Sequence, residues 1–212
     1  MNTIVMKFGG TSVAGTEKLR NIADIVIKEV KNNKIIVVLS AMSGETNKLQ
    51  SFLDDFASQY SLESDLVLTS GEQVTIGLLS AQLKNKGIKS IPLLGWQIPI
   101  ITDDNHEKAK ILHIDNKRIE KFFEKNDVIV LAGFQGISLD GEITSLGRGG
   151  SDTTAVAIAS SVDAKRCDIY TDVDGVYTTD PNIDHNAKKI LKMSYEEMLE
   201  MASTGSKVLH TR

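Results

Sequence analysis

The residues best suited to chemistry lie in the segment 147–154, which reads GRGGSDTT. Its glycines allow the backbone to approach a ligand closely, and Ser151 or Asp152 can cap the apolar run 155–159 as a helix. The N-terminus of a helix carries free N–H groups and a partial positive charge. Because Arg148 stands beside it, the segment predicts a pocket for a carboxylate or a phosphate. A solvent-exposed turn before an ordinary helix is the alternative interpretation.

A second glycine cluster follows a short apolar strand at 4–8, where Lys7 precedes Gly9 and Gly10. A lysine supplies a point charge and glycines supply backbone N–H groups, a combination that favours a polyphosphate over an organic acid. The segment is not a Walker A loop, because the lysine precedes the glycines. It also lacks the G-x-G-x-x-G spacing of a Rossmann fingerprint. A surface lysine is the alternative for Lys7.

Two carboxylates complete a predicted amino-acid site. Arg148 offers a planar fork for a carboxylate, while Glu72 and Asp152 offer negative charge for an ammonium group. Taken alone, Glu72 also fits a solvated helix face. Phosphoryl transfer needs mainly alignment and charge neutralisation, so this set of groups is sufficient for it.

The elements that position these residues follow an α/β pattern. Apolar runs at 4–8, 35–39, 128–132 and 169–171 predict strands, and segments starting at 16, 66 and 116 predict helices. The β-branched run 35–39 is typical of a parallel sheet covered on both faces. Polar loops after Phe8, Leu39, Gly133 and Thr171 are therefore expected to meet at the carboxyl edge of one sheet.

Several local features carry their own expectations. The predicted helix 66–83 contains Gly71 in its interior, which costs backbone entropy. Prolines in the short strands 91–94 and 98–101 indicate sheet edges or strand ends, and the segment 134–143 favours a small hairpin. Ser194 and Glu197 have capping-box spacing. The histidines show no ligand spacing and are expected at the surface: His106, His113, His185 and His210.

Composition narrows the class of protein. The chain has 212 residues, of which 41% are hydrophobic and 25% charged, as in one globular α/β domain. The net charge of -4 argues against a nucleic-acid partner. A single cysteine, Cys167, favours the reducing cytoplasm, and we expect it to be a quiet buried thiol. No signal peptide or membrane-spanning run is recognised, so no membrane partner is expected.

Four segments in order, 7–13, 68–72, 146–152 and 171–181, resemble the signature segments of the aspartate kinases. The resemblance implies the amino-acid kinase fold, a three-layer αβα sandwich around a mainly parallel sheet of eight strands. It also implies transfer of the ATP γ-phosphoryl group to the side-chain carboxylate of L-aspartate, which gives 4-phospho-L-aspartate and ADP. This reaction opens the route to lysine, threonine and methionine.

By motif position, the resemblance implies roles for individual residues. Lys7 and Asp152 would be catalytic, with Lys7 stabilising the transferring phosphoryl group. The implied aspartate-binding residues are Ser40, Thr46, Glu72, Arg148 and Ser151. The implied nucleotide-binding residues are Lys7, Phe8, Gly9, Gly10, Thr171, Asp172, Tyr177, Asp180, Pro181 and Lys207. Mg²⁺ would be carried by the ATP phosphates, with no dedicated protein ligand set.

The resemblance covers nearly the whole chain, and residues 1–212 are expected to form a catalytic domain that is incomplete at its C-terminus. Family members continue into regulatory ACT domains, which we do not find in this sequence, and the full-length protein is expected to be a homo-oligomer. Asn182 and Thr211 depart from the family pattern. Alternative interpretations are another kinase of this fold, acting on N-acetylglutamate, glutamate or a nucleoside monophosphate, and a nucleotide-binding regulatory module without turnover.

Overall fold

The computed structural model describes residues 2–56, 61–179 and 183–203. The chain divides into two compact units, Met1–Tyr170 and Thr171–Arg212. The first unit contains the two glycine clusters, and the second contains the predicted nucleotide loop.

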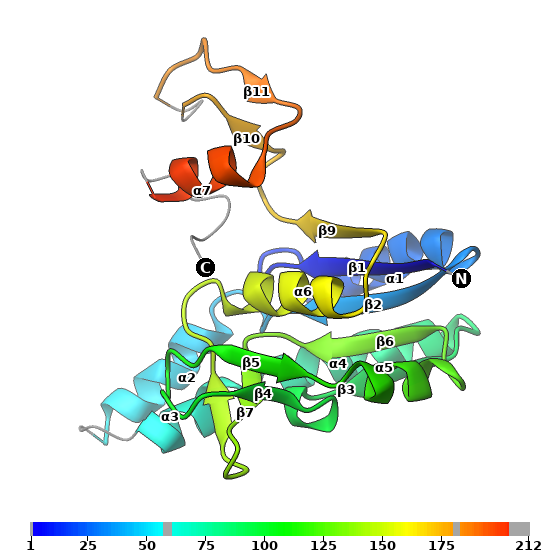
Figure 1. The fold of residues 1–212 in the computed structure, drawn as a ribbon, viewed down its shortest axis with the longest axis vertical. Helices are drawn as coiled ribbons and strands as arrows, with labels where there is room; N and C mark the ends of the chain where they lie inside the picture. Colours follow the sequence, from blue (N-terminus) through cyan, green and yellow to red (C-terminus); the bar gives the residue numbers. More distant parts are fainter. Residues whose placement is uncertain (1, 57–60, 180–182, 204–212) are drawn as a thin grey trace. The chain divides into compact units, whose positions relative to one another are not determined.

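The first unit is built on a sheet of parallel strands, drawn as arrows in Figure 1. The strands lie in the order β3 (Ser90–Leu93), β6 (Val128–Ala132), β2 (Asn33–Leu39), β1 (Asn2–Phe8) and β9 (Arg166–Tyr170). Every pairing among them is parallel. The buried, β-branched runs of the sequence therefore form a parallel sheet, as predicted.

Helices cover both faces of this sheet (Figure 1). Helices α1 (Thr16–Val30) and α4 (Gly71–Asn85) pack on one face with Ile4, Met6 and Phe8. Helices α5 (Asn116–Phe123) and α6 (Gly150–Ser161) pack on the other, with Val5. Because successive side chains of a strand point to opposite faces, each strand contributes to both cores. The result is the predicted three-layer αβα sandwich.

The sheet has five strands in the described part of the chain, not the eight that the resemblance implied. Four short strands form a separate mixed sheet instead, in the order β5 (Ile111–Ile114), β4 (Ile100–Thr102), β7 (Gln135–Ile137) and β8 (Ile143–Ser145). Strands β7 and β8 are antiparallel, which confirms the predicted hairpin.

Both prolines of the predicted short strands lie at the edge of a sheet or next to the end of a strand, as expected. Pro92 lies in β3, an edge strand, so its missing N–H breaks no ladder on the outer side. Pro99 lies between the short helix η1 (Gly95–Gln97) and β4.

The predicted helix 66–83 is wrong in one respect, because the chain forms two helices there. Helix α3 (Ser61–Leu68) ends before Thr69, and α4 begins at Gly71. The Thr69 N–H and Oγ1 both donate to the Asp65 carbonyl, at 3.0 and 2.7 Å, and close α3. Gly71 is therefore at a helix start, where a side chain would collide with Ala41, since a built Cβ lies 2.9 Å from the Ala41 Cβ. Helix α2 (Glu45–Asp54) also belongs to the first unit.

The second unit contains the antiparallel pair β10 (Val176–Tyr177) and β11 (Lys189–Ile190), followed by α7 (Tyr195–Ser203). Ser194 N–H donates to Glu197 Oε2 at 2.7 Å, and Glu197 N–H donates to Ser194 Oγ at 3.2 Å. This reciprocal pair confirms the predicted capping box. Across both units, none of the described helices is long and apolar enough to span a bilayer.

Candidate active site

A polar cavity of about 770 Å³, here called the main cavity, lies at the carboxyl ends of β1, β2 and β6. Its volume falls in the range usual for small-molecule sites. It unites all four chemically prominent residues of the first unit, Lys7, Glu72, Arg148 and Asp152. The two glycine clusters, distant in sequence, therefore face one space, as the sequence predicts for loops that end parallel strands.

Lys7 is a buried cation paired with a carboxylate of α6. Its side chain points to the α6 face of the sheet, as does Val5, because β-strand side chains alternate. Only 7% of the residue is exposed, and its Nζ lies 2.7 Å from Oδ1 of Asp152. A surface position for Lys7 is thereby excluded. The pair joins the central sheet to the first turn of α6 inside the main cavity.

The start of α6 differs from the prediction. Ser151 and Asp152 do not cap the helix, which begins at Gly150 after Gly149 in the left-handed conformation, with φ 69° and no side-chain cap. Ser151 instead packs against Gly133, where a built Cβ would lie 2.8 Å from the Ser151 Cβ. Both side chains lie in the first turn and line the cavity, so neither occupies the N-terminal amide groups as a cap. This helix end keeps its capacity to bind an anion.

Glu72 is a buried carboxylate, and only one of its two oxygens accepts a hydrogen bond from a described residue. It lies in the first turn of α4 and is 3% exposed. The Ala41 N–H donates to Glu72 Oε1 at 3.1 Å, while Oε2 has no partner among the described residues. Burial raises the pKa of Glu72 to about 8, although the hydrogen bond from Ala41 opposes the shift. A solvated helix face is therefore excluded, and the carboxylate is suited to receive a cationic group.

Arg148 is an exposed cation at the same cavity. It forms no ion pair with any residue that the structure describes. Its guanidinium is thus available for bidentate binding of a carboxylate.

The loop after β2 contributes Ser40 and Thr46 to the cavity wall. The Thr75 Oγ1 donates to the Ser40 carbonyl at 3.0 Å, which ties this loop to α4. Gly44, with φ 84°, precedes α2, and Thr46 lies in its first turn. The N-termini of α2 and α6 both border the cavity and add positive potential to it.

The predicted phosphate-binding residues at the end of β1 and just after it have different environments. Phe8 stacks on Tyr170, with ring centroids 4.4 Å apart, and takes no part in the cavity lining. The Gly9 N–H donates to the Tyr170 carbonyl at 3.2 Å, so it is engaged in the β1–β9 pairing. Gly10 lines the cavity, and a built Cβ there would lie 3.0 Å from the Ala41 carbonyl oxygen. Gly10 is therefore better placed than Gly9 to donate to a ligand.

The predicted nucleotide loop lies in the second unit. Thr171 Oγ1 donates to Asp172 Oδ1 at 3.1 Å, and the Tyr177 hydroxyl donates to Asp174 Oδ1 at 2.8 Å. Asp180, Pro181 and Lys207 lie outside the described residues. The nucleotide-binding role of this loop stays a prediction.

Several cavity residues escaped the sequence reasoning, among them Phe134, Ser145 and Glu107. Phe134 has φ 69°, and its position after Gly133, at the end of a buried strand, was an available signal. Such a left-handed backbone is strained for a bulky residue and is found most often at functional sites.

The expected surface position of His106 is also wrong. Its side chain is 13% exposed, and its Nδ1 lies 2.8 Å from Oδ2 of Asp65, a carboxylate that is itself fully buried. Asp65 looks like a solvated helix residue in the sequence, so no local signal marked this pair. His113 and His185 are exposed, as expected, and His210 lies outside the described residues.

In the described segments, no group of three or more His, Cys, Asp or Glu side chains is arranged to hold a metal ion.

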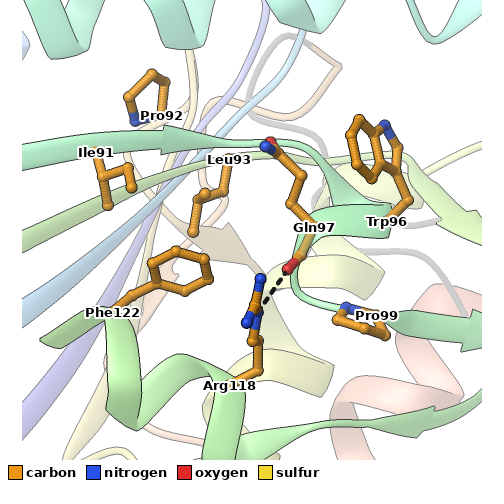
Figure 2. Close-up of a pocket in the computed structure, with 8 residues that line it drawn as sticks. All are labelled: Ile91, Pro92, Leu93, Trp96, Gln97, Pro99, Arg118 and Phe122. Atoms are coloured by element: carbon orange, nitrogen blue, oxygen red, sulfur yellow. Dashed lines mark hydrogen bonds between the residues drawn. The ribbon is translucent and has the colours of Figure 1, made fainter.

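A second cavity of about 380 Å³ is formed by β3, η1 and α5 (Figure 2). Figure 2 shows Arg118 between the Phe122 ring and the Gln97 carbonyl, to which its Nε donates at 3.5 Å. The walls are otherwise apolar or uncharged, so this cavity has no carboxylate or lysine for phosphoryl transfer.

Comparisons with known proteins agree with this geometry. An aspartokinase of Rickettsia felis is 49% identical over 217 residues, which cover 100% of this chain and 54% of the relative. Aspartokinase III of E. coli in complex with aspartate and ADP has a TM-score of 0.86 and 28% identity, covering 99% of this chain and 58% of that one. Aspartate kinase from Synechocystis has a TM-score of 0.84 and 41% identity, and the match covers 98% of this chain and 35% of that one.

The chain spans about half the length of the curated relatives that it matches. Residues 2–212 match the amino acid kinase family. With a three-layer αβα fold and a cation-lined cavity at the carboxyl edge of its parallel sheet, this chain belongs to the amino acid kinase family.

Proposed function

We propose that this chain is the catalytic domain of an aspartate kinase, which transfers the γ-phosphoryl group of ATP to the side-chain carboxylate of L-aspartate. The products are 4-phospho-L-aspartate and ADP. Support comes from aspartokinase relatives that are 49% identical in sequence and from the structural likeness to an aspartokinase in complex with aspartate and ADP.

The single observation that carries the proposal is the content of the main cavity. It combines the Lys7–Asp152 ion pair with the Glu72 carboxylate and the Arg148 guanidinium. Among the described residues, Glu72 Oε2 has no hydrogen-bond partner and Arg148 has no ion-pair partner. An α-amino acid with an acidic side chain carries a matching set of groups. In the proposed complex, Arg148 binds the α-carboxylate and Glu72 receives the α-ammonium group. The side-chain carboxylate then points toward Lys7.

In the proposed reaction, an oxygen of that carboxylate attacks the γ-phosphorus of ATP. A new O–P bond forms as the bond to the β,γ-bridging oxygen breaks, and that oxygen leaves with the electron pair on ADP. Lys7 neutralises charge on the transferring group, and Asp152 holds the Lys7 ammonium in position. Ser40, Thr46 and Ser151 line the acceptor side of the cavity.

For the nucleotide, we propose that Gly10 donates a backbone N–H to a phosphate and that Thr171, Asp172 and Tyr177 belong to the loop that binds ATP. Asp180, Pro181 and Lys207 complete that proposal from the sequence. Mg²⁺ would travel with ATP and neutralise its phosphates when bound.

The charge of Glu72 separates aspartate from acceptors that lack an ammonium group. An N-acetylated acceptor brings no ammonium group to stabilise the ionised form of Glu72, so it lacks the charge-assisted contact that the α-ammonium group of aspartate would make there. We therefore expect N-acetylglutamate to be a poor substrate.

An ATP-dependent hydroxamate assay on the protein in its natural length tests the proposal. L-aspartate, L-glutamate, N-acetyl-L-glutamate and a nucleoside monophosphate serve as acceptors, with ADP release measured in parallel because a phosphorylated nucleotide forms no hydroxamate. Product with L-aspartate and little with the others is the expected result. Absence of any aspartate-dependent product would refute the assignment, and ATP binding by calorimetry without turnover would favour a regulatory module.

We also propose that the natural protein works in the cytoplasm as a homo-oligomer. The single cysteine and the resemblance to aspartate kinases support this. Light scattering of the natural-length protein tests the oligomeric state.

A further inference from the structure

The carboxylate of Asp65 connects three segments of the chain beneath the main cavity. It belongs to α3, is fully buried, and accepts hydrogen bonds from three residues. Ser145 Oγ donates to Oδ1 at 2.5 Å, His106 Nδ1 lies 2.8 Å from Oδ2, and the Glu107 N–H reaches both oxygens at 3.1 and 3.2 Å. A buried carboxylate bound in this way is a strong tether, because charge-assisted hydrogen bonds are stronger than neutral ones.

Two of these donors belong to the wall of the main cavity. Ser145 and Glu107 both line it, and Ser145 ends β8 three residues before Arg148. The Ala109 N–H also donates to the Ser145 carbonyl at 2.9 Å, so the loop 103–109 is attached to β8 as well as to Asp65. The Asp65 carboxylate thus anchors the segment that leads to Arg148.

Through its backbone, Asp65 is also connected to Glu72, which lies in the helix that follows α3. The break between α3 and α4 is closed by Thr69, which donates to the Asp65 carbonyl. Gln135 Nε2 donates to the Thr69 carbonyl at 3.2 Å and fixes that break against β7. Asp65 therefore couples the segment that carries Glu72 to the segment that carries Arg148.

The hydrogen bonds to Asp65 hold the backbone of Glu107 in an unfavourable conformation. Glu107 has φ 65°, in the left-handed region, which is sterically unfavourable for a non-glycine residue. Its N–H points at both oxygens of Asp65, and this double contact accounts for the retained conformation.

His106 adds charge to the same connection. Its Nε2 lies 3.3 Å from Oε2 of Glu142, so both ring nitrogens face carboxylates. Burial lowers the pKa of His106, but hydrogen bonds to Asp65 and Glu142 and their charges outweigh it, and the net pKa is raised. A doubly protonated ring donates to both carboxylates at once.

We propose that Asp65 is a positioning residue for the amino-acid substrate, which sets the spacing between the carboxylate-binding Arg148 and the ammonium-binding Glu72. This inference rests on the proposed function, because it assumes that the main cavity binds aspartate. Asp65 touches neither substrate nor nucleotide. Its loss should therefore weaken aspartate binding and leave the phosphoryl-transfer step nearly intact.

Asp65→Asn is the first test, with kinetics measured on the natural-length protein. The amide keeps the size of the side chain but replaces one acceptor oxygen by a donor and removes the charge. We expect the KM for aspartate to rise about tenfold or more, with kcat and the KM for ATP changed less than about threefold. A purely structural role would instead lower the amount of active enzyme and leave the KM for aspartate unchanged.

A pair of variants at His106 keeps the inference testable if Asp65→Asn does not fold. His106→Ala removes the donor to Asp65 and should raise the KM for aspartate severalfold. His106→Asn supplies an amide donor near the position of Nδ1 and should restore most of the affinity. Equal KM values for both variants and the unaltered protein would overturn the proposal.

Thr102→Val is a matched control, since it removes the buried Thr102–Thr144 hydrogen bond of 2.6 Å in the same small sheet without touching Asp65. It should lower the unfolding temperature and leave the KM for aspartate unchanged. A raised KM in this control would show that any weakening of the sheet affects the cavity, which would contradict a specific role for Asp65.

The outcomes also separate this inference from the proposed function. An unaltered protein that phosphorylates aspartate, together with an Asp65→Asn variant of normal KM, would overturn the positioning role alone. An unaltered protein without aspartate-dependent product would overturn both.

Discussion

Lys7 Nζ of β1 lies 2.7 Å from Asp152 Oδ1 of α6, within a cavity that also contains Glu72 and Arg148. These two residues are far apart in the sequence and meet because β1 and α6 pack together at the carboxyl edge of the sheet. The pair holds a buried cation where a transferring phosphoryl group would need one.

Replacement of the cation should affect turnover more than substrate binding. In Lys7→Met, we expect kcat to fall by about 100-fold or more, because the charge of Lys7 acts mostly on the transition state. The Kd for aspartate, measured by calorimetry, should change much less. Lys34→Met, which breaks the remote Lys34–Asp127 pair of 3.1 Å, is the control and should leave kcat unchanged. Equal losses in kcat and in aspartate affinity would contradict the role of Lys7.

Arg148→Ala should weaken aspartate binding without destabilising the fold. The side chain is exposed and forms no ion pair with the described residues, so its removal leaves no buried group unsatisfied. Loss of a charged hydrogen-bond partner for the α-carboxylate should raise the KM for aspartate about 10- to 100-fold. The unfolding temperature should stay constant, as it should in the control Arg20→Ala on the exposed face of α1. An unchanged aspartate affinity would refute this assignment.

The raised pKa of Glu72 predicts a pH dependence of binding. Below about pH 8 the unliganded protein holds Glu72 mainly protonated, whereas an ammonium group requires the ionised form. Aspartate affinity should therefore increase as the pH rises toward about 8, by up to about tenfold per pH unit, and then level off. Calorimetry in buffers with different ionisation enthalpies should detect proton release on binding at about pH 6.5. Glu72→Gln should bind aspartate weakly, with no such pH dependence.

The raised pKa of Glu72 has the opposite pH dependence for stability: the free energy of unfolding should fall as the pH rises, whereas the aspartate affinity should increase. The native state keeps a proton on Glu72 that the unfolded chain loses above its ordinary pKa of 4.5. The contribution of Glu72 to the free energy of unfolding should then fall as the pH rises from 4.5 to about 8. Chemical denaturation of the unliganded protein should show a greater stabilising effect of Glu72→Gln near the upper end of this window. An effect of the same size at both ends would contradict the assigned pKa.

Two glycines of α4 form a matched pair for testing the close approach of this helix to the loop after β2. In Gly71→Ala, the added Cβ would lie 2.9 Å from the Ala41 Cβ, and overpacking of this kind costs about 1–3 kcal/mol. Gly77→Ala meets nothing within 4 Å and should stabilise the protein by about 0.4–1 kcal/mol. Urea denaturation of both variants measures the difference. Equal effects would show that the α4 contact at Ala41 is not tight.

Much of the fold could be predicted because its signals are local. The apolar runs that became β1, β2 and β6 are buried on both faces, and this burial explains their lack of alternation. The capping box at Ser194 and the hairpin β7–β8 also rest on neighbouring residues. Lys7, Arg148 and Glu72 were identified because their glycine-rich or polar surroundings are unusual for their elements.

Other features depend on contacts between segments that are distant in the sequence, and no local sequence pattern predicted them. The predicted single helix 66–83 divides because Thr69 bonds back to Asp65 while Gly71 packs against Ala41. The predicted cap of α6 by Ser151 or Asp152 gave way to Gly149, since those side chains are engaged with Gly133 and Lys7. His106 was expected at the surface, but a buried carboxylate draws it inward.

The sequence by itself determined the class of the fold, the strands of the central sheet and the kinds of charged group at its carboxyl edge. These follow from hydrophobic periodicity and turn chemistry, which act over a few residues. Only the tertiary structure decided which charges pair, which carboxylate is left half-satisfied, and which buried residue joins the two sides of the cavity. Burial and the distance between side chains control those outcomes, and both arise from packing between segments that the linear order of the chain keeps apart.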